Sequence, residues 1–90
     1  MIKAWRVDFL ASARRELDRL PEPNRRRIVK FLNERIETTE DPRRLGHALA
    51  GPLAGLWSYR VGDFRLIASI EHARVTVLIV GIGNRRHVYR

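Results

Sequence analysis

Apolar positions recur at helical spacing in two segments of the first forty residues. The first segment predicts a helix over about residues 9–19, with Asp8 placed to cap its N-terminus. The side chains expected to be buried on this helix are Phe9, Ala13, Leu17 and Leu20. After a proline-containing break at residues 20–23, the second segment predicts a helix over about residues 23–38 that pairs with the first as an antiparallel hairpin. Its buried stripe is expected to consist of Ile28, Val29, Leu32 and Ile36.

The period of the apolar positions changes to two after a loop of about seventeen residues that is rich in glycine and proline. Alternation on both sides of Gly62-Asp63 predicts a β-hairpin with a two-residue turn. One face of this hairpin should carry Trp57, Tyr59, Val61, Phe64, Leu66, Ala68 and Ile70. A strand over residues 75–82 is apolar on both faces, so we expect it inside the sheet, and residues 2–7 can supply a further strand.

The composition narrows the class of protein. Ninety residues are enough for one core, so the chain is expected to be a single domain over residues 1–90. The chain contains no cysteine, which excludes a disulfide scaffold, a thiolate metal site and a cysteine nucleophile. Its longest apolar run, residues 75–83, is about half a membrane span. We therefore expect a soluble protein of the reducing cytoplasm that makes no use of a membrane.

The chain is strongly basic, with a formal net charge of +8, and arginine supplies all but two of its 18 basic residues. Arginine suits bidentate contact with phosphate, although a merely solvated surface is the alternative. The arginines of the second predicted helix alternate with acidic residues, which is typical of a solvated face, and contact with RNA or a partner is the other reading. Basic residues are least compensated by acids in the C-terminal half, which favours that half for anion binding.

Two arginines are predicted to face each other across the hairpin. A two-residue turn places Arg60 opposite Arg65, on the face away from Trp57. Like charges in this position destabilise a sheet by up to about 1 kcal/mol, so the pair indicates a site for an anion. Ser58 lies on the same face as Arg60 and either donates its hydroxyl to a phosphate or simply faces solvent. The same register, continued through a turn near His72-Ala73, predicts Val80 opposite Arg65 and brings the end of the chain towards this pair.

The chain ends in a basic segment that carries one imidazole and one phenol, Asn84-Arg85-Arg86-His87-Val88-Tyr89-Arg90. Cleavage of a phosphodiester by the neighbouring 2′-hydroxyl needs a base, positive charge around the phosphorane, and an acid for the departing oxygen. Tyr89 can serve as the base if the surrounding arginines lower its pKa, or it can pack on the edge of the sheet. His87 is a second acid–base candidate, or an exposed histidine of the tail, while His47 and His72, in a loop and a turn, are weaker candidates. The sequence predicts no metal site, so a metal-independent reaction without a cofactor is expected.

Two stretches together resemble the RelE branch of the RelE/ParE toxin superfamily. They are GPLAGLWSYRVGDFRLI, residues 51–67, and VGIGNRRHVYR, residues 80–90. The resemblance implies an α+β fold in two layers, in the order β-α-α-β-β-β. Its antiparallel sheet should have the first strand beside the last and a helical hairpin on one face.

The same resemblance implies a ribosome-dependent endoribonuclease, the toxin of a type II toxin–antitoxin system, that cuts messenger RNA. Its partners would be mRNA on the ribosome and an acidic cognate antitoxin, and it would meet operator DNA only through the antitoxin complex. The family's catalytic residues fall on Arg60, Arg65, Arg85 and Tyr89. The neighbouring positions expected to bind substrate are Ser58, Arg86, His87 and Arg90.

Two positions depart from the family pattern. Ser58 stands where relatives usually carry Lys or Arg, and Asn84 stands where many carry His, so one cation and one polar group are missing. The alternative function is a gyrase-inhibiting toxin of the ParE kind without nuclease chemistry. A plain nucleic-acid-binding module is a third reading, whose affinity for RNA would fall steeply with salt while the RNA stayed intact.

Overall fold

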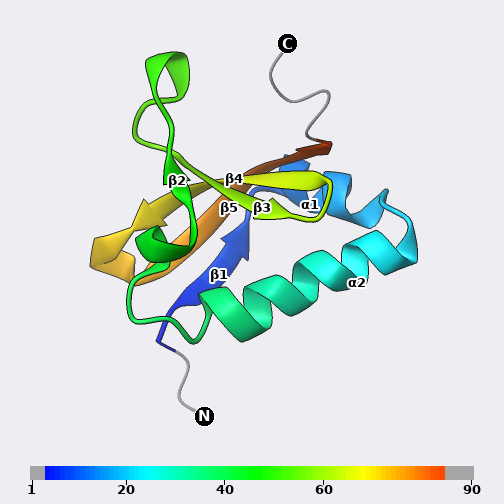
Figure 1. Cartoon of the computed structure of the whole chain (residues 1–90), viewed down its shortest axis with the longest axis horizontal. Helices are drawn as coiled ribbons and strands as arrows, with labels where there is room; N and C mark the ends of the chain where they lie inside the picture. Colours follow the sequence, from blue (N-terminus) through cyan, green and yellow to red (C-terminus); the bar gives the residue numbers. More distant parts are fainter. Residues whose placement is uncertain (1–3, 85–90) are drawn as a thin grey trace.

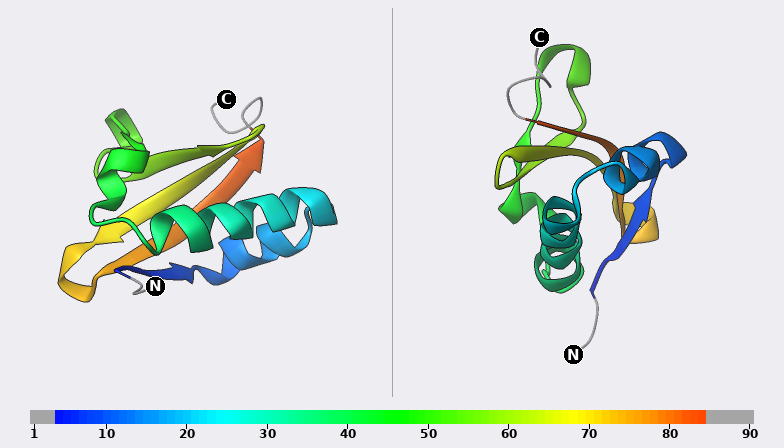
Figure 2. Two further views of the ribbon diagram at one scale, coloured as in Figure 1. Left: turned by 60° about the horizontal axis from the view of Figure 1, so that its bottom comes forward. Right: turned by 90° about the vertical axis from the view of Figure 1, so that its right-hand side faces the viewer.

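The computed structural model describes residues 4–84. In this part of the chain, five strands form one sheet in the order β1-β5-β4-β3-β2. The strands are β1 (Arg6–Phe9), β2 (His47–Ala48), β3 (Trp57–Val61), β4 (Phe64–Glu71) and β5 (Thr76–Asn84). Two helices, α1 (Ala11–Asp18) and α2 (Glu22–Phe31), lie on one face of this sheet (Figures 1 and 2). The predicted two-layer α+β class is confirmed.

The structure corrects the direction of the first strand. β1 lies beside β5, as predicted, but the two strands are parallel, whereas the other strand pairs are antiparallel. The sheet is therefore mixed. The helical segment ends beside the start of β1, where Ala4 N–H donates to the Glu37 carbonyl at 2.7 Å. The chain thus comes back to the end of the sheet at which β1 began, and the next long strand, β3, runs in the same direction as β1.

The boundary between β1 and α1 differs from the prediction. Asp8 does not cap a helix; it lies in β1 opposite Leu78, and α1 begins only at Ala11. Strand pairing explains the shift, because Leu10 N–H still donates to the Ile79 carbonyl at 2.9 Å. The backbone up to residue 10 is thus committed to the sheet. Ala13 is fully buried on α1, as expected from the apolar spacing.

Helix α2 continues into a wider turn at its C-terminal end. Residues Leu32–Ile36 form a π-helical segment, in which Glu37 N–H donates to the Leu32 carbonyl at 3.0 Å. The wider turn suits a stripe spaced every four residues, since it keeps Ile36 on the face that buries Ile28. Val29 was wrongly assigned to this stripe; it is 37% exposed because it points about a quarter turn away from Ile28. No helix of residues 4–84 is long and apolar enough to span a lipid bilayer.

The core fills the space between the helices and one face of the sheet. The predicted apolar face of the β3–β4 hairpin is confirmed, because Tyr59, Val61, Leu66 and Ala68 are all buried there. They pack in one cluster with buried side chains of the helical layer. Strand β5, which lies between β1 and β4, contributes residues to the same cluster, and this confirms its predicted place inside the sheet.

The predicted seventeen-residue loop contains secondary structure of its own. It holds two short 3-10 helices, Pro42–Leu45 and Gly51–Leu53, and between them the two-residue strand β2. β2 pairs antiparallel with the start of β3, His47 opposite Ser58. Figure 1 shows the part after β2 projecting from the body of the molecule. Two residues are too few to produce a recognisable alternation, so the sequence pattern does not predict this strand.

The register between β4 and β5 also differs from the prediction. Arg65 lies opposite Gly83, three residues further along than the expected Val80. Two features cause the shift. The connection is a short 3-10 helix, His72–Arg74, followed by Val75, and β5 has a bulge that leaves Val80 without a partner in β4.

Candidate functional site

The β3–β4 hairpin carries the two arginines expected to bind an anion. Arg60 lies directly opposite Arg65, and Val61 opposite Phe64, so the predicted register is confirmed. Gly62 permits the tight turn because its φ of +60° lies in the left-handed region that glycine adopts readily. Since neighbouring residues of a strand point to opposite faces, the two arginines start from the face away from the helices. The Arg60 side chain also lines a separate hollow, beside α2, whose lining includes Glu34.

A hollow of about 230 Å³ lies over the face away from the helices. Its lining consists of His47, Leu49, Ser58, Arg60 and Arg65. Ser58 is only 5% exposed, because β2 pairs alongside it, so the reading of a serine simply facing solvent is wrong. No carboxylate lines the hollow, and Arg60 forms no ion pair with any acid of residues 4–84. An anion entering the hollow would meet guanidinium groups, a hydroxyl and an imidazole.

Four other arginines of the described part are neutralised locally. Arg26 pairs with Glu22, Arg14 lies 3.7 Å from Asp18, and Arg74 donates to Glu71 at 2.8 Å. Arg43 binds Asp41 through both its backbone N–H and its side chain, and this lowers the pKa of the Asp41 carboxyl to about 2. Arg60 has no such ion pair with an acid of residues 4–84 and lines the hollow, so it is available for a ligand.

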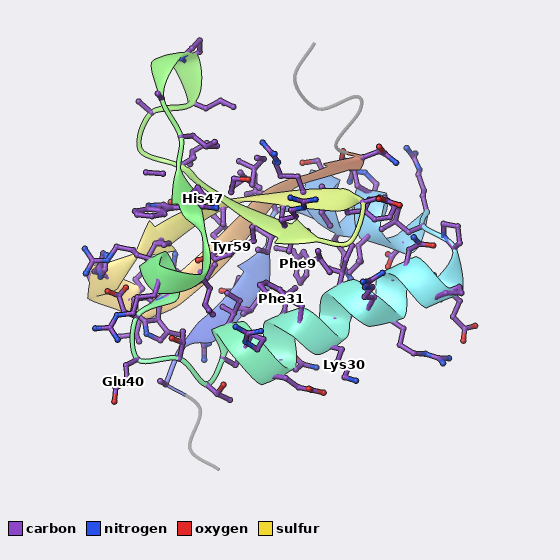
Figure 3. All side chains as sticks on the ribbon, in the orientation of Figure 1. Phe9, Lys30, Phe31, Glu40, His47 and Tyr59 are labelled. Atoms are coloured by element: carbon purple, nitrogen blue, oxygen red, sulfur yellow. The ribbon has the colours of Figure 1, made fainter. Side chains whose placement is uncertain are left out.

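Tyr59 belongs to the same motif as Arg60 but has a structural role. Its ring is fully buried, close to that of Phe31, between β3 and α2 (Figure 3). Its hydroxyl donates to the Pro42 carbonyl at 2.7 Å, which fastens the segment before β2 to the core. Burial, and secondarily the charge of Asp41, raise the pKa of Tyr59, so this phenol stays protonated. It cannot serve as a base at neutral pH.

His47 also lines the hollow. It was a weak candidate because it lay in a predicted loop, whereas the structure places it on β2 at the edge of the sheet (Figure 3). The only local signal is the glycine before it. A Cβ at Gly46 would come within 2.7 Å of the Ser58 carbonyl oxygen and 2.9 Å of the Tyr59 ring, so glycine is needed for this close approach.

The chain is similar to known toxins. Residues 7–89 match the family described as the ParE toxin of the type II toxin–antitoxin system parDE. The chain is 34% identical to the toxin RelG of Mycobacterium tuberculosis over 86 residues, 96% of this chain and 97% of RelG. It is 36% identical to the toxin RelE of the same organism, over 96% of this chain and 87% of that protein. The chain belongs to the RelE/ParE superfamily of toxins.

A solved member of this superfamily has the same fold over nearly its whole length. It is a chain of the toxin–antitoxin complex RelBE2 of Mycobacterium tuberculosis, which superposes with a TM-score of 0.83 at 32% identity. The alignment covers 94% of this chain and 95% of that one. The mixed sheet and the two helices are therefore those of a RelE-like toxin.

Part of the family's expected site lies outside the described residues. Arg85, Arg86, His87, Tyr89 and Arg90 all fall in the segment after Asn84. The described chain ends in register with the arginine pair, since Gly83 lies opposite Arg65 and Asn84 opposite Phe64. The roles expected for these five residues stay predictions. Within residues 4–84, no group of three or more acidic or histidine side chains is arranged to hold a metal ion.

Proposed function

We propose that this RelE-like toxin is an endoribonuclease that cuts messenger RNA on the ribosome, in the cytoplasm, without a metal or a cofactor. The observation that carries the proposal is the Arg60–Arg65 pair, set face to face on adjacent strands over a hollow that no carboxylate lines. Such a pair opposes folding slightly and is suited to binding a group with two negative oxygens. The scissile phosphate of RNA has this chemistry.

In this proposal the arginines stabilise negative charge on the phosphate, and a tyrosine of the C-terminal segment transfers a proton. Arg60, Arg65 and Arg85 hold the phosphate and stabilise the charge that develops on the phosphorane. Tyr89 removes the proton of the 2′-hydroxyl, which then attacks the adjacent phosphorus. Ser58, Arg86, His87 and Arg90 contact the substrate around this centre. The products are a 2′,3′-cyclic phosphate and a 5′-hydroxyl end.

We also propose that a cognate antitoxin with an acidic surface controls the toxin. The solved relative is itself a toxin–antitoxin complex. The formal charge of +8 and the uncompensated Arg60 make an acidic partner complementary to this chain. The complex, rather than the toxin alone, would bind the operator DNA.

The proposal is tested by mapping transcript ends after the protein is induced in cells, beside an Arg65→Ala variant. We expect new 5′ ends within translated regions for the wild type and none for the variant. The family that matches the chain is named for ParE, so inhibition of DNA gyrase is the competing function. DNA-damage signalling without new mRNA ends would establish that alternative and refute the nuclease.

A further inference from the structure

We propose that His47 is the general acid of the cleavage reaction, donating a proton to the departing 5′-oxygen of the RNA. This inference rests on the proposed nuclease function. That reaction needs a proton donor, and arginine donates poorly because its ordinary pKa lies far above neutral pH. Among the described residues that line the hollow, His47 carries the only imidazole, the side chain most often used for general acid catalysis.

The strand register brings His47 to the arginine pair. His47 lies directly opposite Ser58 in the antiparallel β2–β3 ladder, so both side chains project on the same face with Cβ atoms about 5 Å apart. Arg60 follows two residues later on that face and is itself opposite Arg65. The imidazole therefore borders the same hollow as the two guanidinium groups, from the neighbouring strand. A phosphate bound by the arginines would have His47 on its β2 side.

Three contacts fix β2, and with it His47, against β3. Gly46 allows the backbone to approach the Ser58 carbonyl more closely than any side chain would permit. Before β2, the Tyr59 hydroxyl holds the Pro42 carbonyl at 2.7 Å. After β2, Leu49 N–H donates to the Leu56 carbonyl at 2.9 Å. A two-residue strand would otherwise fray, and a catalytic group needs this kind of support. His47 itself remains exposed, so its ring can reach a substrate.

The proton and electron pairs balance without a further reactant. The 2′-oxygen loses its proton to the base and forms a bond to phosphorus. The bond between phosphorus and the 5′-oxygen breaks, and its electron pair stays on that oxygen. The protonated imidazole of His47 supplies the proton that makes the leaving group a neutral hydroxyl. Water restores both groups before the next turnover.

The test compares two RNA substrates on programmed ribosomes under single-turnover conditions. One is ordinary mRNA, and the other carries sulfur in place of the scissile 5′-oxygen, because a thiolate departs without protonation. We expect His47→Ala and His47→Gln to slow cleavage of ordinary mRNA about 10² to 10⁴-fold. With the sulfur substrate, both variants should cut within a few-fold of the wild-type rate.

The matched control is His72→Ala. His72 is the other histidine of the described residues, and it lies in the β4–β5 connection, away from the hollow. Its ring centroid is 5.6 Å from that of Trp5. This variant should cut both substrates at the wild-type rate. Equal losses on both substrates for the His47 variants would overturn the acid role, and so would no loss on either. A wild type that cuts neither substrate would instead refute the proposed nuclease, and this role with it.

Discussion

The two ends of the β-sheet differ in how their charged side chains are arranged. The arginine end, at the β3–β4 turn, sets Arg60 opposite Arg65 above a hollow whose lining contains no carboxylate. The connection end, at residues 71–75, pairs Arg74 with Glu71 and packs His72 edge-on against Trp5. The arginine end is the one proposed to bind an anion, whereas the connection end pairs its charges locally. Substitutions at the arginine end should change activity, and those at the connection end should change stability.

The largest expected effect comes from removing Arg60. Arg60→Ala should lower the single-turnover cleavage rate on ribosomes by about 10² to 10³, because one preorganised donor to the developing charge is lost. The same variant should keep or slightly raise the thermal stability, by at most about 1 kcal/mol, since a like-charge cross-strand pair disappears. Cleavage measured beside calorimetric melting checks both parts. A variant that melts early and loses activity together would break the comparison between the two ends.

Tyr59→Phe sharpens the comparison because it changes the residue next to Arg60. The variant leaves the buried Pro42 carbonyl without its 2.7 Å hydrogen bond, so the free energy of unfolding should fall by about 1 to 3 kcal/mol. Chemical denaturation measures this loss. Residual activity per folded molecule should stay above that of Arg60→Ala. A variant with unchanged stability would mean that the contact between the Pro42 segment and β3 contributes little.

Val75→Gly should stabilise the connection end. Val75 has a φ of +49°, which is costly for a β-branched residue, and its side chain is 45% exposed. Replacement by glycine should therefore raise the free energy of unfolding by about 1 kcal/mol, with cleavage unchanged. Val75→Ala serves as the control, since alanine removes most of the side chain without relieving the positive φ fully. A glycine variant no more stable than the alanine variant would contradict the strain.

The smallest effect is expected from Glu71→Gln. The Arg74–Glu71 ion pair is short at 2.8 Å, but the Arg74 side chain is 64% exposed. Exposed pairs contribute little, so the loss of stability should be no more than about 0.5 kcal/mol. Melting at low and high salt measures it, and the difference from wild type should shrink as salt rises. A loss of several kcal/mol would show that local neutralisation is a main source of stability at this end.

The sequence predicts the parts of this fold that repeat a pattern over several residues. Alternation across Gly62-Asp63 was long enough to establish both the buried face and the Arg60–Arg65 register. The β4–β5 register failed because it depended on a connection and a bulge at Val80, neither of which leaves a periodic trace. Asp8 was misassigned because pairing with β5, a contact distant in sequence, outweighed its local preference as a helix cap.

The candidate site also contains residues that a repeating sequence pattern predicts and residues that it does not. The arginine pair could be predicted because both residues lie on one hairpin. His47 could not, because it reaches the hollow through a two-residue strand and a backbone approach that only the folded chain shows. Tyr59 was predicted on the apolar face of the hairpin, and its complete burial confirms this placement.

One edge of β5 is of interest because it could pair with a strand of a second molecule. Within residues 4–84, β1 pairs with β5 only as far as Ile79, so no described strand covers that side of β5 further along. There the Glu16 side chain accepts a hydrogen bond from Ile82 N–H at 3.1 Å. An open strand edge is a template for pairing with another chain. Because a carboxylate from α1 already occupies this donor and adds negative charge beside it, a second molecule gains little by adding its own strand. The Glu16 carboxylate therefore makes this edge of β5 less suited to edge-to-edge pairing between two molecules.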